Sequence, residues 1–464
     1  MNIEKWIAAK IAEDIEFREA TRGQPPRRLT RRDIERYQLF KINKMIRYVS
    51  EMSPFHRGLA ERVGRLKTLE DLRKIPFTTA ADLSQDPYRL LCVSLTGVVR
   101  IFSHFTTGTV TRRPKKIFFT QADIGRIVES MSVVLQTVFE SAELEAAGCK
   151  VQIFLPNNGE PLSMAQMIAE GVRRLGGTPV IGLCEASTIE QIESVIMTKP
   201  DMLMGSAFRL WRITQVGREL RDLSAAGVKI IFVTSEYLST AMRKRIEDIW
   251  NAAVYHHYGM TEPGFVVGVE CCQHDGFHFN ECDLYFEVVD PETGDVLMNG
   301  EEGELVFTSL EREGMPFIRY RTGDIASLTG ATCGCGASSL FRIGTLSKKL
   351  GMIHSIGHGG TVYSSLFDEA LYDIPELIDY RIYLSRRCGI DSLTCKVETL
   401  HQDPWLLLEI ERCLSEVGPI KRALDEGILF RPVVEIAARE SLRRGGRSLK
   451  RKIVDERARE EISH

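Results

Sequence analysis

Apolar and amphipathic segments alternate along residues 121–250, and this alternation limits the fold more than any other feature of the sequence. The apolar segments are short and rich in Val, Ile and Leu, which is typical of buried strands. The segments between them carry apolar residues at helical spacing. A strand–helix–strand order needs crossover connections, so it predicts a mostly parallel sheet with helices on both faces. The expected strands are 151–156, 179–182, 202–205 and 229–234, and the expected helices are 123–139, 164–175, 187–197 and 208–226.

The chain is too long for a single ordinary core. With 464 residues, two or more domains are expected. We predict a large N-terminal α/β domain at residues 1–349, with a charged helical lead-in at 1–75 and a β-rich region at 265–340. A smaller α+β domain is expected at residues 350–464, because two strand patterns there precede a helical pattern.

Composition and charge exclude several classes of protein. The net charge of −3 gives no overall basic field of the kind that nucleic-acid binding requires. No run of 18 apolar residues is present, so no membrane span is expected. The first residues lack the basic and then apolar segments of a signal peptide. Eleven cysteines without such a signal indicate reduced thiols, so we expect a cytoplasmic protein that binds neither nucleic acid nor membrane.

The segment from Tyr255 to Asp324 carries groups that suit a nucleotide. One strand pattern leads to Tyr258-Gly259-Met260-Thr261-Glu262, which offers a hydroxyl to phosphate and a carboxylate to Mg²⁺. Another strand pattern ends in Thr322-Gly323-Asp324, whose carboxylate can accept both hydroxyls of a ribose. Between them, residues 291–295 predict a turn that joins two strands. Each motif alone is weak, because a Thr-Gly-Asp segment is more often only a turn.

Together the motifs resemble the adenylate-forming superfamily, and within it the phenylacetate–coenzyme A ligase family. The resemblance rests on Tyr-Gly-x-Thr-Glu, Asp-Pro-Glu-Thr-Gly, Gly-Glu-Leu-Val-Phe-Thr and Ile-Arg-Tyr-Arg-Thr-Gly-Asp, at residues 258–262, 290–294, 303–308 and 318–324. It covers nearly the whole chain and implies a large AMP-binding domain with a small mobile C-terminal lid. It also implies a two-step reaction. A carboxylate attacks the α-phosphate of ATP to give an acyl-AMP and pyrophosphate, and a thiol, usually coenzyme A, then displaces AMP.

The family resemblance implies roles for individual residues. Thr261 and Glu262 would be catalytic, with Thr261 on phosphate and Glu262 on Mg²⁺. Tyr258 and Gly259 would lie beside the adenine, and Asp324 would bind the ribose. The other implied residues are Ser235 and Glu236 beside the adenine, Lys349 in place of a ribose-binding arginine, and Lys450 as the lysine that stabilises charge on the α-phosphate.

Three of these assignments have structural alternatives. Thr234 or Ser235 could instead cap the helix that follows. Lys450 lies one residue from the family position, in a basic segment that could be a solvated tail. Lys349 lacks the planar guanidinium of the arginine that it replaces, and Gly351 stands where relatives have the hinge residue of the lid.

A hydroxyl-rich loop is the candidate phosphate-binding segment. Thr106-Thr107-Gly108-Thr109 matches the family pattern, and the backbone N–H groups of such a loop can converge on phosphate oxygens. The following residues depart from that pattern, because Val110 and Thr111 stand where relatives have Thr and Gly. Without this glycine the backbone φ is restricted, and closure of the loop on the phosphates is in question. A surface hairpin loop is the alternative.

Cysteine and histidine residues gather in two clusters, one before the β hairpin of the central segment and one after it. Two such clusters, joined by a hairpin that brings its ends together, indicate a tetrahedral zinc site. The resemblance implies that the ligands are Cys271, His278, Cys333 and Cys335, with Cys272 and His274 as rivals. The site would be closed and structural, since four protein ligands leave no position for water. Free buried cysteines with ordinary histidines are the alternative.

The function expected from these features is that of an ATP-dependent carboxylic acid–coenzyme A ligase. Its cofactors would be ATP, Mg²⁺, coenzyme A and a structural Zn²⁺. Phe208 and Phe265 suit a pocket for an aryl or another small apolar acid. Two alternatives stay open: a degenerate nucleotide- or acyl-AMP-binding protein on the same fold, and an adenylating enzyme with an acceptor other than coenzyme A. Relatives are often dimers, so a homodimer is a further expectation.

Overall fold

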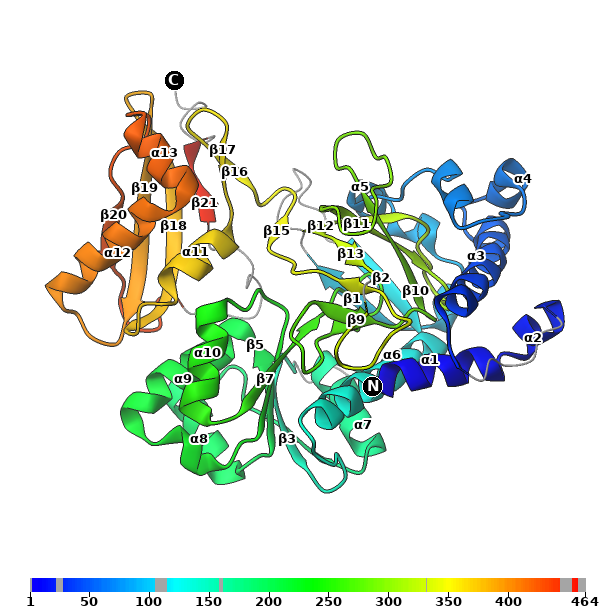
Figure 1. The fold of residues 1–464 in the computed structure, drawn as a ribbon, viewed down its shortest axis with the longest axis horizontal. Helices are drawn as coiled ribbons and strands as arrows, with labels where there is room; N and C mark the ends of the chain where they lie inside the picture. Colours follow the sequence, from blue (N-terminus) through cyan, green and yellow to red (C-terminus); the bar gives the residue numbers. More distant parts are fainter. Residues whose placement is uncertain are drawn as a thin grey trace. The chain divides into compact units, whose positions relative to one another are not determined.

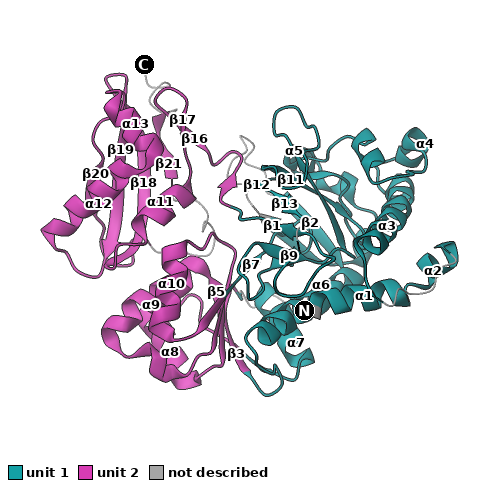
Figure 2. Ribbon diagram, viewed as in Figure 1, with its two compact units in different colours: residues 1–149, 157–179, 255–346 teal, residues 150–156, 180–254, 347–464 magenta. Residues whose placement is uncertain are grey.

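The computed structural model describes residues 2–21, 28–104, 115–157, 162–330, 332–442 and 453–457. Their contacts divide the chain into two compact units, shown in teal and magenta in Figure 2. Unit 1 comprises residues 1–149, 157–179 and 255–346, and unit 2 comprises residues 150–156, 180–254 and 347–464. This grouping reflects packing alone, so the separate mobile domain expected at residues 350–464 stays a prediction.

Reciprocal caps define where the longer helices of unit 1 begin. At the start of α3, the Thr30 hydroxyl accepts the Asp33 N–H and the Asp33 carboxylate accepts the Thr30 N–H. Thr120 and Asp123 form the same capping box before α6. No helix in the described ranges is both long and apolar enough to cross a membrane. The helices of unit 1 are α1 (Asn2–Glu13), α2 (Ile15–Thr21), α3 (Arg31–Met52), α4 (Leu59–Val63), α5 (Ala80–Gln85), α6 (Gln121–Ser141) and α7 (Met164–Arg174), with 3₁₀ turns at Glu70–Lys74, Pro87–Leu90 and Leu95–Gly97.

An antiparallel meander forms the β-rich part of unit 1. Strand β11 (Gly303–Ser309) pairs with β10 (Leu284–Val289) on one side and with β12 (Tyr320–Ala326) on the other. The predicted turn between β10 and β11 is present, since the Asp290 carboxylate accepts two backbone N–H groups and Gly294 has φ 78°. The other strands are β1 (Val98–His104), β2 (Lys115–Thr120), β7 (Ala253–Tyr258, in unit 1 from Tyr255), β8 (Gly268–Val269), β9 (Phe277–Phe279), β13 (Leu328–Thr329) and β14 (Arg342–Ile343).

The parallel sheet expected from the alternating segments is confirmed in unit 2. Strand β5 (Met202–Ser206) pairs in parallel with β3 (Lys150–Phe154) and with β6 (Ile230–Thr234). The helix predicted at 208–226 is wrong at its C-terminal end. It stops at Leu220, because Arg221 is extended and the Asp222 carboxylate caps a separate 3₁₀ turn. The helices here are α8 (Thr188–Thr198), α9 (Ala207–Leu220) and α10 (Thr240–Trp250), and β4 spans Thr178–Ile181.

The C-terminal part of unit 2 is the expected α+β module. Strand β18 (Leu377–Arg387) pairs antiparallel with β19 (Ile390–Thr399). The outer strands β20 (Val433–Ile436) and β21 (Ile453–Asp455) pair in parallel with β19 and β18. In Figure 1, helices α12 (Pro404–Glu416) and α13 (Gly418–Asp425) lie along this sheet. The remaining elements are β15 (Lys348–Lys349), β16 (His354–Ile356), β17 (Gly360–Val362) and α11 (Ser364–Leu371).

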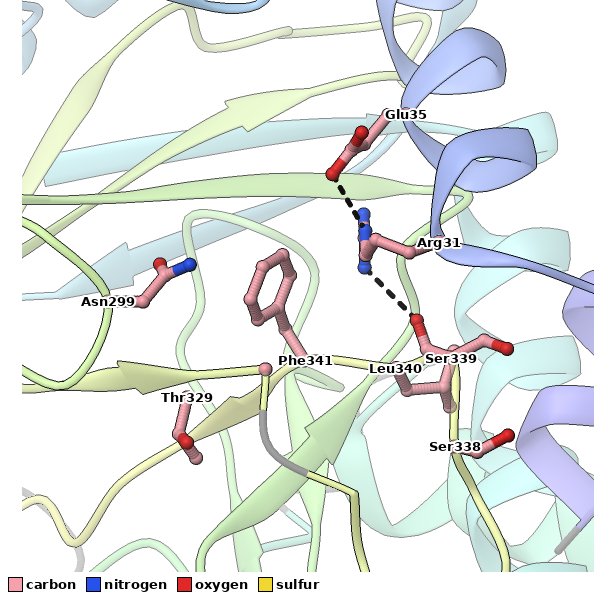
Figure 3. Close-up of a pocket in the computed structure, with 9 residues that line it drawn as sticks. Arg31, Glu35, Asn299, Thr329, Ser338, Ser339, Leu340 and Phe341 are labelled. Carbon is pink, nitrogen blue, oxygen red and sulfur yellow. Dashed lines mark hydrogen bonds and ion pairs between the residues drawn. The ribbon is translucent and has the colours of Figure 1, made fainter.

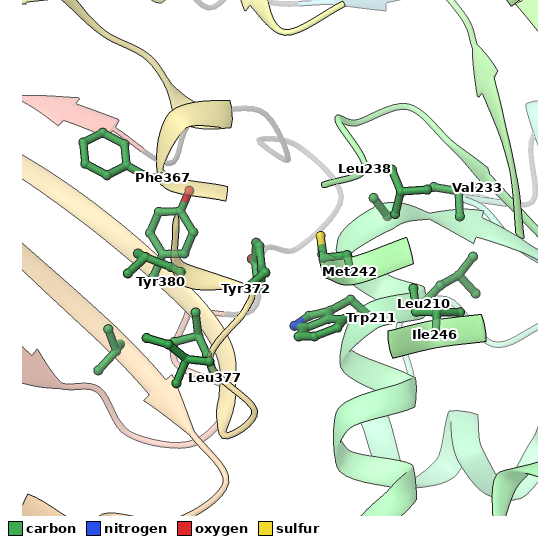
Figure 4. Close-up of a cluster of buried hydrophobic side chains, with 14 of the residues drawn as sticks. Leu210, Trp211, Val233, Leu238, Met242, Ile246, Phe367, Tyr372, Leu377 and Tyr380 are labelled. Atoms are coloured by element: carbon green, nitrogen blue, oxygen red, sulfur yellow. The ribbon is translucent and has the colours of Figure 1, made fainter. Parts of the chain in front are cut away.

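One hydrophobic core runs through unit 2. Figure 4 shows Trp211 of α9 and Met242 of α10 facing Tyr372, which follows α11. The Trp211 and Tyr372 ring centroids are 5.2 Å apart, and the Trp211 Nε1–H donates to the Ile378 carbonyl at 3.1 Å. Each large side chain that is fully buried in this way contributes about 1.5–3 kcal/mol. The helices beside the parallel sheet and the C-terminal module are therefore stabilised by a shared core.

Candidate active site

Strand β7 ends at Tyr258, whose phenol hydroxyl reaches the carboxylate of Asp324 in β12. The hydroxyl donates to Asp324 Oδ2 at 2.7 Å, across 66 residues of sequence. Burial raises the pKa of Tyr258 well above its ordinary value, so the phenol stays protonated and keeps its donor. The tyrosine expected beside the adenine and the carboxylate expected on the ribose therefore contact each other directly.

The Thr-Gly-Asp segment lies inside β12, so the prediction that a strand ends there is wrong. The register between β11 and β12 shifts between Glu304 and Val306, which marks a β-bulge. Gly323 has φ 76°, and its N–H donates to Glu304 Oε1 at 2.9 Å. The Asp324 N–H donates to Thr322 Oγ1 at 3.0 Å. Because a bulge re-aims the side chains around it, this local irregularity sets the direction of the Asp324 carboxylate.

Thr261 and Glu262 follow β7 in a turn, and the Glu262 carboxylate is held by two buried groups. Lys115 Nζ lies 2.9 Å from Glu262 Oε1 and 2.9 Å from the Tyr320 hydroxyl oxygen. The Tyr320 hydroxyl lies 3.1 Å from the same Glu262 Oε1. Burial raises the pKa of Tyr320 well above its ordinary value, so its hydroxyl stays neutral. Lysine, tyrosine and glutamate thus form a closed triangle of hydrogen bonds.

A buried arginine holds the backbone of this turn. Arg312 donates to the Glu262 carbonyl, and at 3.3 Å to the Phe118 carbonyl in β2. Its guanidinium lies 4.4 Å from the Phe119 ring centroid and 5.7 Å from that of Phe317. Burial lowers the pKa of Arg312 to about 10, which still leaves it charged at neutral pH. The turn is therefore attached to β2 by a cation between two aromatic rings.

The backbone on either side of the turn is tightly constrained. A Cβ on Gly259 would lie 2.6 Å from the Phe265 carbonyl oxygen, so only glycine fits there. The Phe265 N–H donates to the Met260 carbonyl at 2.6 Å, with φ 70° at Phe265. The Phe265 ring packs against Phe102 and Phe119, at centroid distances of 4.6 and 5.7 Å. Phe265 is therefore mostly buried, and its contact with the acid stays a prediction.

Ser235 and Glu236 lie in unit 2, directly after β6. The Glu236 carboxylate accepts the Phe208 N–H at 3.1 Å, and Ser235 has φ 77°. Helix α10 is capped by Ser239, so the alternative in which Thr234 or Ser235 caps it is wrong. A positive φ is uncommon for a residue with a side chain and is often found at functional sites.

Several predicted residues lie outside the described ranges or in short elements. Thr106-Thr107-Gly108-Thr109 and Lys450 belong to segments that the structure does not describe. Lys349 is half-buried in β15, and Gly351 follows it with φ 75°, a conformation that favours glycine. The roles of all these residues stay predictions.

The four predicted zinc ligands meet at one place in unit 1. One ligand atom from each of Cys271, His278, Cys333 and Cys335 lies within 4.8 Å of every other. Cys271 Sγ is 3.6 Å from Cys333 Sγ, and Cys335 Sγ is 3.5 Å from His278 Nε2. A hydrogen bond from the Cys271 thiol lowers the pKa of Cys335 below its ordinary value, which favours the thiolate. Three sulfurs and one imidazole nitrogen at this spacing fit tetrahedral zinc.

The rival ligands lie outside this group. Cys272 is exposed to solvent. His274 Nδ1 lies 3.3 Å from Glu270 Oε2, and the Glu270 carboxylate also accepts the His256 N–H at 2.9 Å. These residues offer controls for the zinc site.

A separate pocket of about 540 Å³ lies beside α3 in unit 1 (Figure 3). Arg31 donates to Glu35 at 3.2 Å and to the Ser339 carbonyl at 3.4 Å, and its guanidinium lies 4.4 Å from the Phe341 ring centroid. A further bond of 2.6 Å joins Arg31 to the buried Glu281. Arg31 therefore links α3 to the segments on the other side of the pocket by hydrogen bonds. None of the residues given a role above lines this pocket.

Comparison with known proteins decides the family. No family model matches the chain. The phenylacetate–coenzyme A ligase of Thermus thermophilus is 30% identical over 383 residues, which cover 80% of this chain and 82% of that enzyme. The enzyme of the same name from Escherichia coli K12 is 30% identical over 394 residues, or 82% and 86% of the two chains. The chain belongs to the phenylacetate–coenzyme A ligase family.

Solved structures show the fold of this ligase. The 2-hydroxyisobutyryl-CoA ligase, in the postadenylation state with 2-HIB-AMP, matches with a TM-score of 0.74 at 22% identity over 92% of this chain and 91% of that one. The anthranilate CoA ligase AuaEII, in complex with anthranoyl-AMP, matches with a TM-score of 0.52 at 13% identity over 75% and 66%. The predicted fold class and the predicted class of enzyme, an AMP-forming acid–coenzyme A ligase, are confirmed.

Sequence reasoning about this ligase missed the groups that surround Glu262. Lys115 lies six residues after Thr109 of the candidate phosphate loop, and Tyr320 lies inside the motif that ends at Asp324. Because both residues lie near family motifs, their positions in the sequence could have marked them as candidates for the site. Arg312 lies in a stretch without a motif, so no local signal marks it.

Proposed function

We propose that this ligase activates an aryl or another small apolar carboxylic acid. The acid oxygen attacks the α-phosphorus of ATP, the bond to pyrophosphate breaks, and acyl-AMP forms. The sulfur of coenzyme A then attacks the acyl carbon, the bond to the AMP oxygen breaks, and the thioester forms. The observation that carries this proposal is the contact between Tyr258 and Asp324, because it joins the two ends of the family's most specific segment at 2.7 Å.

In this proposal, residues of this segment and of four other parts of the chain bind and orient the nucleotide. Tyr258 lies beside the adenine and fixes Asp324, whose carboxylate accepts the ribose hydroxyls. Thr261 donates to phosphate, as do the backbone groups of Thr106-Thr107-Gly108-Thr109, while Lys450 offsets charge that develops on the α-phosphate. Ser235 and Glu236 flank the adenine, and Lys349 contacts the ribose. No side chain forms a covalent intermediate, so positioning and charge stabilisation supply the catalysis.

Glu262 is the proposed ligand for Mg²⁺. Its side chain is 11% exposed and offers the carboxylate oxygen that this hard cation prefers. Lys115 Nζ lies 2.9 Å from Glu262 Oε1, and this positive charge supports the proposal that the carboxylate is ionised. When bound, Mg²⁺ neutralises charge on the phosphates of ATP.

A structural zinc ion is proposed for Cys271, His278, Cys333 and Cys335. The convergence of four soft or borderline ligands supports it, since zinc sites with four protein ligands are typically structural. A zinc ion there would join the loop before β9 to the segment after β13. We further propose a cytoplasmic location, a homodimer, and no binding of nucleic acid or membrane, all from sequence.

Pyrophosphate release from MgATP tests the function. We would compare aryl, arylalkyl and short aliphatic acids, each with and without coenzyme A. Release that depends on an aryl or apolar acid, and that rises with coenzyme A, is the expected result. Release with coenzyme A absent and no thioester when it is present would favour another acceptor. Binding of ATP without release for any acid would favour a degenerate binding protein.

A further inference from the structure

The triangle of Lys115, Tyr320 and Glu262 contains one side chain with a rigid ring and one with a flexible chain. The Tyr320 side chain is fully buried, with its ring 4.9 Å from Phe317 and 5.4 Å from Phe307 between centroids. This packing leaves the phenol oxygen little freedom. Lysine carries its ammonium on a long flexible chain, so Lys115 can move where Tyr320 cannot. The fixed position in the triangle is therefore that of the phenol hydroxyl.

The charges in the triangle change when a second cation arrives. Lys115 compensates the buried Glu262 carboxylate at 2.9 Å. A divalent cation on the same carboxylate repels this ammonium, because two cations would then share one partner. The Tyr320 hydroxyl is neutral, so this repulsion does not act on it. Its hydrogen bond to Glu262 Oε1 can persist while the lysine moves away.

We propose that Tyr320 is a positioning residue, which holds the Glu262 carboxylate in one orientation for Mg²⁺ through the hydrogen bond to Oε1. This inference rests on the proposed function, in which Glu262 is the magnesium ligand. Groups that orient a metal ligand typically change metal affinity or activity by about 10–100-fold when they are removed. Tyr320 belongs to this class, since it contacts the ligand and acts through it.

The test is the gain in ATP affinity that Mg²⁺ produces. Calorimetry gives the Kd for ATP with excess EDTA and with saturating Mg²⁺, and their ratio is the magnesium gain. Tyr320→Phe keeps the ring and removes only the hydroxyl. The gain should fall about 10-fold or more, while the Kd measured in EDTA stays within about 2-fold of the wild-type value. A loss of folding alone would change both Kd values together.

The chain contains a matched control for this substitution. Tyr37 donates to the Asp14 carboxylate at 3.2 Å, and Lys41 bonds the same carboxylate oxygen at 3.1 Å. Lys41 also lies 5.4 Å from the centroid of the Tyr37 ring, much as Lys115 lies 5.6 Å from that of Tyr320. Tyr37→Phe removes the same kind of hydroxyl from a carboxylate that also bonds a lysine, far from Glu262 in the sequence. It should leave the magnesium gain unchanged.

A double-mutant cycle shows whether Tyr320 acts through Glu262. Glu262→Gln should abolish most of the magnesium gain, and adding Tyr320→Phe to it should cause little further loss. The proposal would be overturned if the two substitutions reduced the magnesium gain by independent factors that multiply in the double variant. It would also be overturned if Tyr320→Phe kept the magnesium gain of the wild-type protein, or if that variant failed to fold. The proposal would also be overturned if the wild-type protein bound ATP with the same Kd in Mg²⁺ and in EDTA. Acid-dependent pyrophosphate release by that same protein would still leave the proposed function standing.

Discussion

The hydroxyl of Tyr258 donates a hydrogen bond of 2.7 Å to Oδ2 of Asp324. The two residues lie at the ends of two different strands predicted from the sequence, and they contact each other in unit 1. Gly323, with φ 76°, precedes Asp324, and both lie where the register between β11 and β12 shifts, so the carboxylate is oriented both by its backbone and by Tyr258. A carboxylate fixed in this way suits the proposed role of Asp324, which is to accept the two hydroxyls of a ribose.

Removal of the Tyr258 hydroxyl should weaken nucleotide binding. In Tyr258→Phe, Asp324 loses the hydrogen bond from the phenol and the orientation that this bond provides. We expect AMP to bind about 10-fold more weakly, which equals about 1.4 kcal/mol and is typical of one hydrogen bond to a charged group. Calorimetry measures the Kd. Tyr48→Phe is the control, since that hydroxyl donates to the Glu313 carbonyl at an exposed site. Equal Kd values for both variants would contradict the role of Tyr258.

Much of the fold could be predicted because its signals are local. The order of β3, β5 and β6 follows from short apolar segments and from helix caps such as Ser187 with Glu190, which lie three residues apart. The approach of Cys271, His278, Cys333 and Cys335 was also predictable, because the family resemblance implied these four residues and a hairpin brings the two clusters together. In these cases the residues that act together lie close in sequence or at the ends of one supersecondary unit.

The surroundings of Glu262 could not be predicted in the same way. Lys115 reaches Glu262 across 147 residues, and no periodicity links the two positions. Arg212 similarly meets Glu398 across 186 residues. The bulge at Gly323 was missed because a register shift depends on the partner strand, which a single segment does not reveal. Tertiary packing alone determines such contacts, and they are the ones that orient the site.

His56 should make the fold sensitive to acid. Burial, with a smaller contribution from Arg62, lowers the pKa of His56 to about 4, while Asp82 acts in the opposite direction. Its Nε2 meets no hydrogen-bond partner among the residues that the structure describes, which agrees with a neutral ring. Below pH 6.5 the unfolded chain binds a proton that the folded chain does not bind until about pH 4. Stability is therefore lost as the pH falls through this window, by about 2 kcal/mol between pH 7 and pH 5.

Urea unfolding at pH 7 and pH 5 measures this loss. In His56→Leu the difference between the two free energies of unfolding should shrink by about 2 kcal/mol, whatever the effect on stability at pH 7. His358→Leu is the control, because His358 is exposed. An unchanged pH difference in His56→Leu would show that His56 is not the source of the acid sensitivity.

Arg212 should be critical for the stability of unit 2. Its guanidinium bonds Glu398 through two nitrogens at 2.7 and 2.9 Å and lies 3.4 Å from Asp379, all nearly buried. Arg212→Met would leave two buried carboxylates without their cation, so we expect a loss of about 3–5 kcal/mol in urea unfolding. Arg386→Met removes a pair whose arginine is 47% exposed, and should cost at most about 1 kcal/mol. Similar losses in the two variants would argue against a special role for Arg212.

The zinc site provides the most direct chemical prediction. Purified protein should contain about one zinc ion per chain, as measured by atomic absorption, because the four proposed ligands would form one closed tetrahedral site. Cys335→Ser removes a ligand whose thiolate is favoured by its hydrogen bond from Cys271, so it should lose most of the zinc. Its thermal midpoint should also fall, as should that of the wild-type protein after treatment with a strong chelator.

Cys272→Ser is the matched control, since Cys272 is adjacent to Cys271 in sequence but exposed and outside the group of four. It should keep both its zinc and its thermal midpoint. Loss of zinc from Cys272→Ser, with retention in Cys335→Ser, would reverse the assignment of the ligands. The wild-type protein could also lack zinc and fail to bind it after refolding in the presence of the metal. That result would favour free thiol and imidazole groups that pack together without a metal. Zinc retained by Cys335→Ser and lost on His278→Ala would show that three of the four ligands suffice.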